Sequence, residues 1–382
     1  MDKLKVFFDA SPATVGYEGV PVFARETIRH LAEYSEIELH SGLISISPGE
    51  HKKYRAVLNG LTGHRVKYHS LFFPGRYGGK IRGMAFCSRK YDVVHCSTHY
   101  VPPHCAFSDF SNVILSVHDM FLWHEEYQFD NNNREKVKKR IAEHAEKALA
   151  IVTMSEFSKR EINKFLGIPM EKIYTVPLAT QWSGRPEVGA ETSREVPERA
   201  LKESTPYFMS VSTLYPHKNH IALLTAFNKY HHSPDYGGEK LVIVGNRKLE
   251  FPEIYNTLVN TPDVIHLQNV PENDLRSIYK NSKGFFLVSK LEGFGIPLLE
   301  AMSSKVPACY GKGSAMDEIG RDAAWGVDPD DIDAIAELFA RFSGGGDEID
   351  RRVDSAYNIS LEYSYQKTVD TYVNIYRKLC FR

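Results

Sequence analysis

The 382-residue chain lacks the features that mark several classes of protein. It has five cysteines and no C-x-x-C pair, so neither a disulfide framework nor a zinc ribbon is expected. No apolar run reaches about 18 residues, and the N-terminus lacks the apolar segment of a signal peptide, so no membrane span is expected. The formal net charge of −1 gives no overall field that would attract nucleic acid. These absences favour a globular cytoplasmic protein.

Signals for cofactors and metals are also weak. No G-x-G-x-x-G follows the first predicted strand, Leu4–Phe8, which disfavours a nicotinamide dehydrogenase. Two D-x-D pairs lie over residues 328–333. They directly precede a predicted helix, where aspartate is a usual capping or first-turn residue. We therefore expect no metal site and no cofactor.

Short apolar runs alternate with helical patterns along most of the chain, and the alternation restarts at Tyr207. At roughly 100–200 residues per domain, the length predicts two domains. The alternation predicts that both are doubly wound, mostly parallel α/β domains. We place them at residues 1–182 and 206–362, joined by a polar linker over 183–205. A helix over 363–382 is expected to pack back on the N-terminal domain.

The most informative segment is a turn between a predicted strand and a predicted helix. The strand ends near Ser289, and Gly293-Phe294-Gly295 leads into a helix that begins near Ile296. Glycines let a backbone approach a ligand closely, and the first turn of a helix offers free N–H groups to a diphosphate. By itself, such a turn is more typical of a tight strand–helix connection. The residues on either side of it decide the interpretation.

Two carboxylates flank this turn. Glu292 precedes the helix, and Glu300 lies one turn inside it. Carboxylates beside a phosphate site would repel the phosphate, so they are better suited to accept hydrogen bonds from hydroxyl groups. Such hydroxyl groups fit a sugar and a ribose beside the diphosphate.

Glu292 and Glu300, eight residues apart around Gly-Phe-Gly, resemble the E-x7-E motif of the family 4 retaining glycosyltransferases, which have the GT-B fold. The segment 211–227 is similar to the family's phosphate-binding strand–loop–helix, in which Lys218 matches the lysine that holds the donor diphosphate. Thr213 and His217 stand at places where many members have a basic residue. The resemblance leaves His217 or Arg247 to share the second basic role.

The N-terminal half shows weaker matches in the expected order. Gly19 looks like the family's glycine after the first strand, and His118-Asp119 looks like its strand-end pair. Ser155 and Ser158 resemble a conserved helix start, and 317–319 resembles a loop after the E-x7-E motif. The resemblance implies two Rossmann-like domains that face each other across a cleft. It places the acceptor in the N-terminal domain and the donor in the C-terminal domain.

The resemblance implies a metal-independent hexosyltransferase that retains the anomeric configuration. The donor would be a nucleotide-diphosphate sugar, with a GDP-sugar and a mannose-like hexose favoured over a UDP-sugar. The acceptor would be a glycan or lipid-linked glycan, as in O-antigen or other surface polysaccharide biosynthesis. Glu292, His118 and Lys218 would be catalytic. The donor-binding residues would be Gly19, Thr213, His217, Lys218, Arg247, Gly293, Phe294, Gly295, Ile296 and Glu300.

Two other functions are compatible with this pattern. A nucleotide-sugar epimerase on the same fold would need acid/base carboxylates and no acceptor, so analysis of products without an acceptor separates it from a transferase. A non-catalytic nucleotide-sugar-binding protein is the second. The presence of Glu292, Glu300 and Lys218 argues against it.

Charge is uneven in the N-terminal half. Residues 51–90 hold ten Lys or Arg and no Asp or Glu, with tyrosines and phenylalanines between them. Such a stretch is attracted to an anionic lipid surface, and no nucleic-acid-binding module accompanies it. We favour peripheral contact with the inner face of the plasma membrane, or an anionic lipid-linked acceptor, over a merely solvated face.

Overall fold

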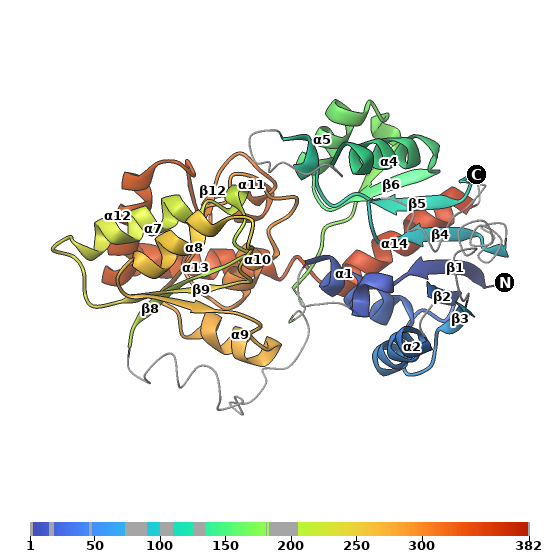
Figure 1. The fold of residues 1–382 in the computed structure, drawn as a ribbon, viewed down its shortest axis with the longest axis horizontal. Helices are drawn as coiled ribbons and strands as arrows, with labels where there is room; N and C mark the ends of the chain where they lie inside the picture. The colour runs from blue at the N-terminus through green and yellow to red at the C-terminus, as the bar shows by residue number, and fades with distance from the viewer. Residues whose placement is uncertain are drawn as a thin grey trace. The chain divides into compact units, whose positions relative to one another are not determined.

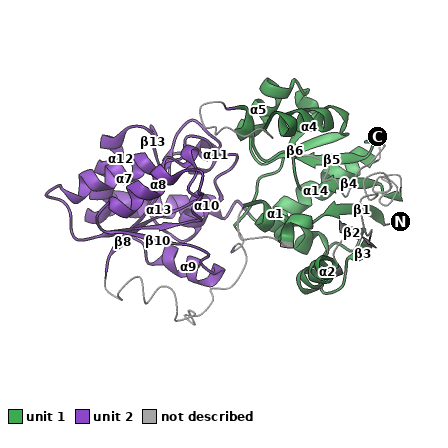
Figure 2. Ribbon diagram, viewed as in Figure 1, with its two compact units in different colours: residues 1–123, 131–181, 364–382 green, residues 124–130, 182–363 purple. Residues whose placement is uncertain are grey.

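A computed structural model describes residues 3–14, 19–45, 48–72, 90–99, 110–124, 134–180, 182 and 205–380. The chain divides into two compact units, coloured green and purple in Figure 2. Unit 1 contains residues 1–123, 131–181 and 364–382, and unit 2 contains residues 124–130 and 182–363. Each unit is built around its own sheet.

The sheet of unit 1 has seven parallel strands in the order β3-β2-β1-β4-β5-β6-β7 (Figure 1). Its central strands are apolar and buried because helices cover both faces of a doubly wound sheet. The strands are β1 (Leu4–Asp9), β2 (Ile37–Ser45), β3 (Lys67–Phe72), β4 (Val93–Cys96), β5 (Val113–Ser116), β6 (Ala150–Thr153) and β7 (Ile173–Thr175).

The helices of unit 1 include one from the far end of the sequence. They are α1 (Gly19–Leu31), α2 (Pro48–Thr62), α4 (Arg134–Lys147), α5 (Glu156–Leu166) and α14 (Tyr365–Cys380). α14 packs against α1. The buried Tyr376 hydroxyl of α14 lies 2.5 Å from His95 Nδ1 on β4, and His95 Nε2 lies 2.8 Å from the Ser116 hydroxyl on β5. Buried polar contacts therefore tie α14 to the middle of the sheet.

Unit 2 repeats the design with six parallel strands in the order β10-β9-β8-β11-β12-β13. The strands are β8 (Tyr207–Val211), β9 (Lys240–Val244), β10 (Val264–Leu267), β11 (Gly284–Leu287), β12 (Ala308–Gly311) and β13 (Trp325–Val327). The helices are α7 (His220–His231), α8 (Pro252–Asn260), α9 (Glu272–Lys280), α10 (Ile296–Ser303), α11 (Met316–Gly320), α12 (Ile332–Gly344) and α13 (Asp347–Ser360). The prediction of two doubly wound, parallel α/β units is confirmed.

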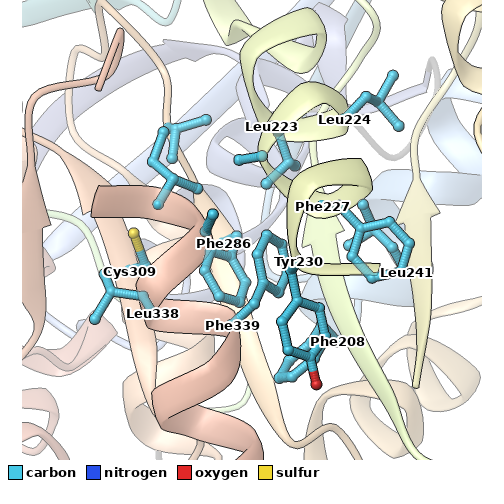
Figure 3. Close-up of a cluster of buried hydrophobic side chains, with 14 of the residues drawn as sticks. Phe208, Leu223, Leu224, Phe227, Tyr230, Leu241, Phe286, Cys309, Leu338 and Phe339 are labelled. Carbon is cyan, nitrogen blue, oxygen red and sulfur yellow. The ribbon is translucent and has the colours of Figure 1, made fainter. Parts of the chain in front are cut away.

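Aromatic side chains dominate the core between the sheet of unit 2 and helices α7 and α12 (Figure 3). Phe286 of β11 stacks on Phe339 of α12, with ring centroids 3.9 Å apart. Phe208 of β8 meets both of these rings edge-on. Such packing fixes β8 and β11 as neighbours, and the predicted donor-binding turns follow these two strands.

The ends of unit 2 differ slightly from the predicted boundaries. Trp182, predicted to end the N-terminal domain, belongs to unit 2. Its indole is almost fully buried and lies edge-on to Tyr279 of α9. Tyr363, predicted to begin the C-terminal helix, also belongs to unit 2 and packs against Phe294. Both aromatic side chains gain more burial in unit 2 than a linker would give them.

Candidate active site

The turn after β11 carries most of the predicted donor-binding residues. Gly295 caps α10 with a φ of 109°, and Pro297 lies in the first turn of the helix. A Cβ on Gly295 would also lie 2.8 Å from Met316 Cγ. Glycine is therefore the residue that satisfies both the backbone angle and the space. Pro297 has no N–H, and the N–H groups of Leu298 and Leu299 donate to the Gly295 carbonyl at 3.0 and 3.2 Å. The Ile296 N–H and the positive end of the helix dipole are therefore what this turn offers a phosphate.

Phe294, between the two glycines, anchors this turn. Its side chain is 8% exposed, and its ring lies edge-on to Tyr363 with the centroids 5.9 Å apart. The Ala315 N–H donates to the Glu292 carbonyl at 3.3 Å, which attaches the turn to the segment before α11. Of the predicted donor-binding residues in the turn, Phe294 can therefore offer a ligand its backbone but not its ring.

The second predicted element follows β8. A short 3-10 helix over Pro216–Lys218 leads to Asn219, which has a φ of 57° and turns the chain into α7. β8 and β11 are paired in the sheet, so their carboxyl ends are adjacent. The Lys290 N–H donates to the His217 carbonyl at 2.8 Å and joins the two turns. The sheet therefore brings together two segments that lie far apart in the sequence.

Lys218 and Glu292 meet at this junction. Lys218 Nζ donates to Glu292 Oε1 at 2.7 Å, and the two side chains are 18% and 13% exposed. Neither side chain is fully buried, so a ligand can reach both. A lysine suited to a diphosphate is thus held by a carboxylate suited to sugar hydroxyls. A bound donor could separate the pair by giving each group a new partner.

Glu300 lies deeper than its neighbours. Its side chain is 5% exposed, and the Tyr279 hydroxyl donates to its Oε2 at 3.0 Å. Burial is the main reason that the pKa of Glu300 is raised to about 8; the hydrogen bond from Tyr279 works against this shift, and the nearby charge of Glu272 adds to it. The buried environment destabilises the ionised form of Glu300, so the carboxyl is mostly neutral at neutral pH. A perturbed group of this kind is characteristic of a functional site.

Thr213 and Arg247 lie on touching loops after β8 and β9. The Leu214 N–H donates to the Asn246 carbonyl at 3.0 Å, and a Cβ on Gly245 would lie only 1.9 Å from the Ser212 carbonyl oxygen. The guanidinium carbon of Arg247 lies 3.9 Å from the ring centroid of Tyr255. This stacking holds the cation flat at the carboxyl edge of the sheet.

His217 differs from its predicted role as a second cation. It is buried and stacks on Tyr215, with ring centroids 5.7 Å apart. Desolvation, with the neighbouring charge of Lys218, lowers the pKa of His217 to about 2. The imidazole is therefore neutral at physiological pH. His217 remains a candidate for a hydrogen bond to a phosphate, and the positive charge of this loop comes from Lys218.

In unit 1, His118 lies at the carboxyl end of β5. The Nε2–H of its imidazole donates to the Ser97 carbonyl at 2.8 Å, and its ring meets Phe23 edge-on. Desolvation lowers the pKa of His118 to about 4, and the nearby His99 contributes. The imidazole is therefore neutral, with Nδ1 as its acceptor. Asp119 Oδ1 accepts the Phe121 N–H at 3.0 Å and caps a turn.

Gly19 is the exposed first residue of α1. A Cβ at this position would meet nothing within 4 Å. Residues 15–18, which form the loop before Gly19, lie outside the described residues. Nothing in the described part of unit 1 demands a glycine here.

Sequence reasoning missed Tyr279, His99 and Asn219. Tyr279 comes from α9, on which no motif lies, and only the buried face of that helix marks it. His99 follows β4 and lies beside His118, with ring centroids 5.2 Å apart. Asn219 Nδ2 donates to the Pro329 carbonyl at 2.6 Å and fastens the Lys218 turn to the loop before α12. A polar residue at the carboxyl end of a buried strand was the available signal for His99.

The two D-x-D pairs have structural partners. Asp331 caps α12 by accepting the Ala334 N–H at 3.0 Å, as predicted from its position. Asp330 pairs with Lys290 at 2.6 Å, and Asp328 accepts the Asp330 N–H at 3.0 Å. Across the described ranges, no three His, Cys, Asp or Glu side chains come together as a metal site would require.

The basic stretch is described only in part, because residues 73–89 lie outside the described residues. α2 exposes Lys52, Lys53 and Arg55 to solvent. Lys67 of β3 is neutralised by Glu38 at 2.9 Å. In the portion of the chain that the structure describes, no helix is both long enough and apolar enough to cross a membrane.

Comparison with known proteins agrees with this geometry. Residues 17–180 match the family model Glycosyltransferase Family 4, and residues 192–358 match Glycosyl transferases group 1. The O-antigen chain mannosyltransferase B of Escherichia coli is 25% identical over 344 residues, covering 87% of this chain and 89% of that protein. The O-antigen chain mannosyltransferase RfbU of Salmonella typhimurium is 26% identical over 263 residues, 65% of this chain and 67% of that protein.

Solved structures of similar fold cover the whole chain. The Anabaena protein HepE in complex with UDP and glucose has a TM-score of 0.73 at 14% identity, over 98% of this chain and 100% of that one. A glycosyltransferase from Rickettsia africae has a TM-score of 0.70 at 14% identity, over 99% of each chain. The two family models together span parts of both units. The chain therefore belongs to the family 4 glycosyltransferases, and its two units have the GT-B fold.

Proposed function

We propose that this glycosyltransferase moves a hexose, with mannose favoured, from a GDP-sugar to a glycan or lipid-linked glycan during surface polysaccharide assembly, with retention of anomeric configuration. The similar proteins from Escherichia coli and Salmonella typhimurium, both O-antigen mannosyltransferases, support the sugar and the process. The observation that carries the proposal is the 2.7 Å contact between Lys218 Nζ and Glu292 Oε1. In this contact, a cation suited to a diphosphate lies beside a carboxylate suited to sugar hydroxyls, and this chemistry supports the proposal.

In the proposed complex, the donor exchanges partners with this pair. Lys218 turns to the diphosphate, together with the Ile296 N–H at the start of α10, and Glu292 accepts hydrogen bonds from hydroxyls of the donor sugar. The ribose lies at Glu300. Nδ1 of His118 accepts a hydrogen bond from a hydroxyl of the sugar, since the Nε2–H of His118 already donates to the Ser97 carbonyl. Gly19 gives a phosphate or sugar oxygen close access to the start of α1.

The reaction breaks the bond between the anomeric carbon and the diphosphate oxygen. The acceptor hydroxyl forms its new bond on the same face, through an oxocarbenium-like state, and its proton passes to the departing diphosphate. No carboxylate nucleophile of the glycosidase kind is proposed. Lys218 and the N-terminus of α10 stabilise the charge that develops on the leaving group. Because these groups supply positive charge, we propose that the reaction needs no metal ion.

Product analysis tests this proposal. The protein is incubated with GDP-mannose or UDP-glucose, with and without octyl α-mannoside, in the presence and absence of EDTA. We expect an α-linked product with GDP-mannose, formed only with the acceptor and at a rate that EDTA leaves unchanged. Proton NMR of the product reports its anomeric configuration.

Each rival gives a distinct result in the same experiment. A β-linked product would overturn retention, and loss of rate with EDTA would overturn metal independence. A second nucleotide-sugar formed without the acceptor would indicate an epimerase. Binding of the donor without turnover would indicate a non-catalytic binding protein.

We also propose that α2 brings the enzyme to an anionic membrane surface. Replacing Lys52, Lys53 and Arg55 with alanine is expected to weaken binding about 100-fold, since each basic residue near such a surface contributes about 1 kcal/mol. Co-sedimentation with vesicles of about 30% phosphatidylglycerol in phosphatidylethanolamine measures the effect.

α4 offers a matched control for this experiment. Lys136, Lys139 and Arg140 are similarly exposed on a helix of the same unit but lie outside the basic stretch. Alanine at these three positions changes the net charge equally. If both triple variants lose vesicle binding to the same extent, overall charge and not α2 attracts the membrane, and this proposal is wrong.

A further inference from the structure

Tyr279 is held in one position on α9. Its side chain is fully buried. The ring centroid lies 5.4 Å from that of Trp182, in an edge-on contact, and 5.5 Å from that of Phe285. Two aromatic neighbours therefore fix the ring, and the ring fixes the hydroxyl. A buried phenol needs a hydrogen-bond partner, and α10 supplies it.

The hydroxyl has two acceptors and one proton. It lies 3.0 Å from Glu300 Oε2 and 3.3 Å from the Pro297 carbonyl oxygen. When Glu300 is ionised, the Tyr279 proton is directed to Oε2. When Glu300 is protonated, its own proton can point to the phenol oxygen, and the phenol can donate to Pro297 instead. The same three groups therefore satisfy both protonation states without any movement of the backbone.

The other oxygen of Glu300 is left for a ligand. Tyr279 contacts Oε2, and Oε1 accepts no hydrogen bond from the residues that the structure describes. We propose that Tyr279 is a positioning residue for nucleotide recognition, because it holds Oε2 of Glu300 and leaves Oε1 for the ribose hydroxyls of the donor. This inference rests on the proposed function, in which Glu300 binds the ribose.

Tyr279→Phe removes the hydroxyl and keeps the ring. Isothermal titration calorimetry measures binding of GDP and of UDP, each compared with its 2′,3′-dideoxy analogue. For the nucleotide that binds the wild type, we expect about a 10-fold weaker Kd in Tyr279→Phe near pH 7, the worth of one buried hydrogen bond to a carboxylate. The dideoxy analogue, which lacks the ribose hydroxyls, should bind both proteins within about twofold of each other.

The pH dependence separates positioning from a loss of packing. The bond from Tyr279 favours the ionised form of Glu300, so the variant should hold Glu300 neutral to higher pH. Its deficit for the ribose nucleotide should therefore be larger near pH 7 than near pH 9. A purely structural defect would weaken binding equally near pH 7 and near pH 9, and equally for the ribose nucleotide and its dideoxy analogue. Either result would overturn the inference.

Two further variants keep the test sharp. Tyr207 is also a buried tyrosine of unit 2, but its hydroxyl donates to the Ile278 carbonyl at 2.9 Å. Tyr207→Phe should leave the preference for ribose over dideoxyribose unchanged. Because Tyr279 acts through Glu300, Glu300→Gln with Tyr279→Phe should bind no more weakly than Glu300→Gln alone. An additional loss in the double variant would contradict the inference.

Failure of the proposed function looks different. A wild type that binds neither GDP nor UDP would remove the donor site itself, and the inference with it. A wild type that binds one of them, with no selective loss in Tyr279→Phe, would leave the donor site intact and remove only the role of Tyr279.

Discussion

Replacing Lys218 with alanine is expected to lower kcat/KM for the donor by about 10²–10³-fold, the usual cost of removing one preorganised group that stabilises charge on a leaving group. The variant loses the cation proposed to face the diphosphate. It also leaves Glu292 without its 2.7 Å partner. Steady-state kinetics with GDP-mannose and octyl α-mannoside measure the loss of rate, and thermal shifts in GDP measure the loss of nucleotide binding.

Lys229 provides the control for this prediction. It is an exposed lysine of unit 2 that pairs with Asp333 on the surface. Lys229→Ala removes an ion pair of a kind that contributes about 0–1 kcal/mol and should leave the rate unchanged. A Lys218→Ala enzyme within about threefold of the wild type would show that the diphosphate is held elsewhere, with Arg247 the next residue to replace.

Glu300→Gln is expected to stabilise unit 2 at alkaline pH while weakening the nucleotide complex. Burial raises the pKa of Glu300 to about 8, whereas an unfolded glutamate titrates near 4.3. Between these values the folded protein holds a proton that the unfolded chain has released, so stability falls as pH rises through this window. The amide keeps the shape of the side chain and has no charge to bury.

The size of this effect follows from the shift. A displacement of between three and four pH units corresponds to about 5 kcal/mol at most, reached above about pH 8. Thermal melts of wild type and Glu300→Gln should coincide near pH 4.5 and diverge toward about pH 9, with the variant melting higher. Equal melting curves at every pH would mean that the carboxyl is ionised and well solvated in the folded protein.

The strands that could be predicted most clearly from the sequence are the buried ones. β4, β5, β6 and β11 are fully buried and mostly apolar because both faces of a parallel sheet are covered. β2 and β3 were not predicted, since they lie at one edge of the sheet and mix polar with apolar residues. α2 was interpreted only as part of a charged stretch, because its apolar face is narrow.

The parts of the site that could be predicted are those that local backbone geometry marks in the sequence. The turn at Gly293–Gly295 and the start of α10 were visible in the sequence because glycine and proline mark backbone geometry locally. The contact between Lys218 and Glu292 joins residues 74 positions apart, and only the pairing of β8 with β11 brings them together. Tyr279 had no local mark, since its partner lies on another helix. The pKa of His217 depends on burial, which residue type does not reveal.

The route of the chain through unit 1 has a consequence for biosynthesis. Tyr372 and Tyr376, which pack on His95 in the middle of this sheet, lie on α14, and α14 follows the whole of unit 2 in the sequence. During translation, the first sheet leaves the ribosome with His95 uncovered, and the whole of unit 2 is synthesised before α14 arrives. All of unit 2 except residues 124–130 is one continuous segment, from Trp182 to Tyr363, which precedes α14 and can complete its core first. The nascent first unit therefore keeps part of its core exposed until α14 has been made.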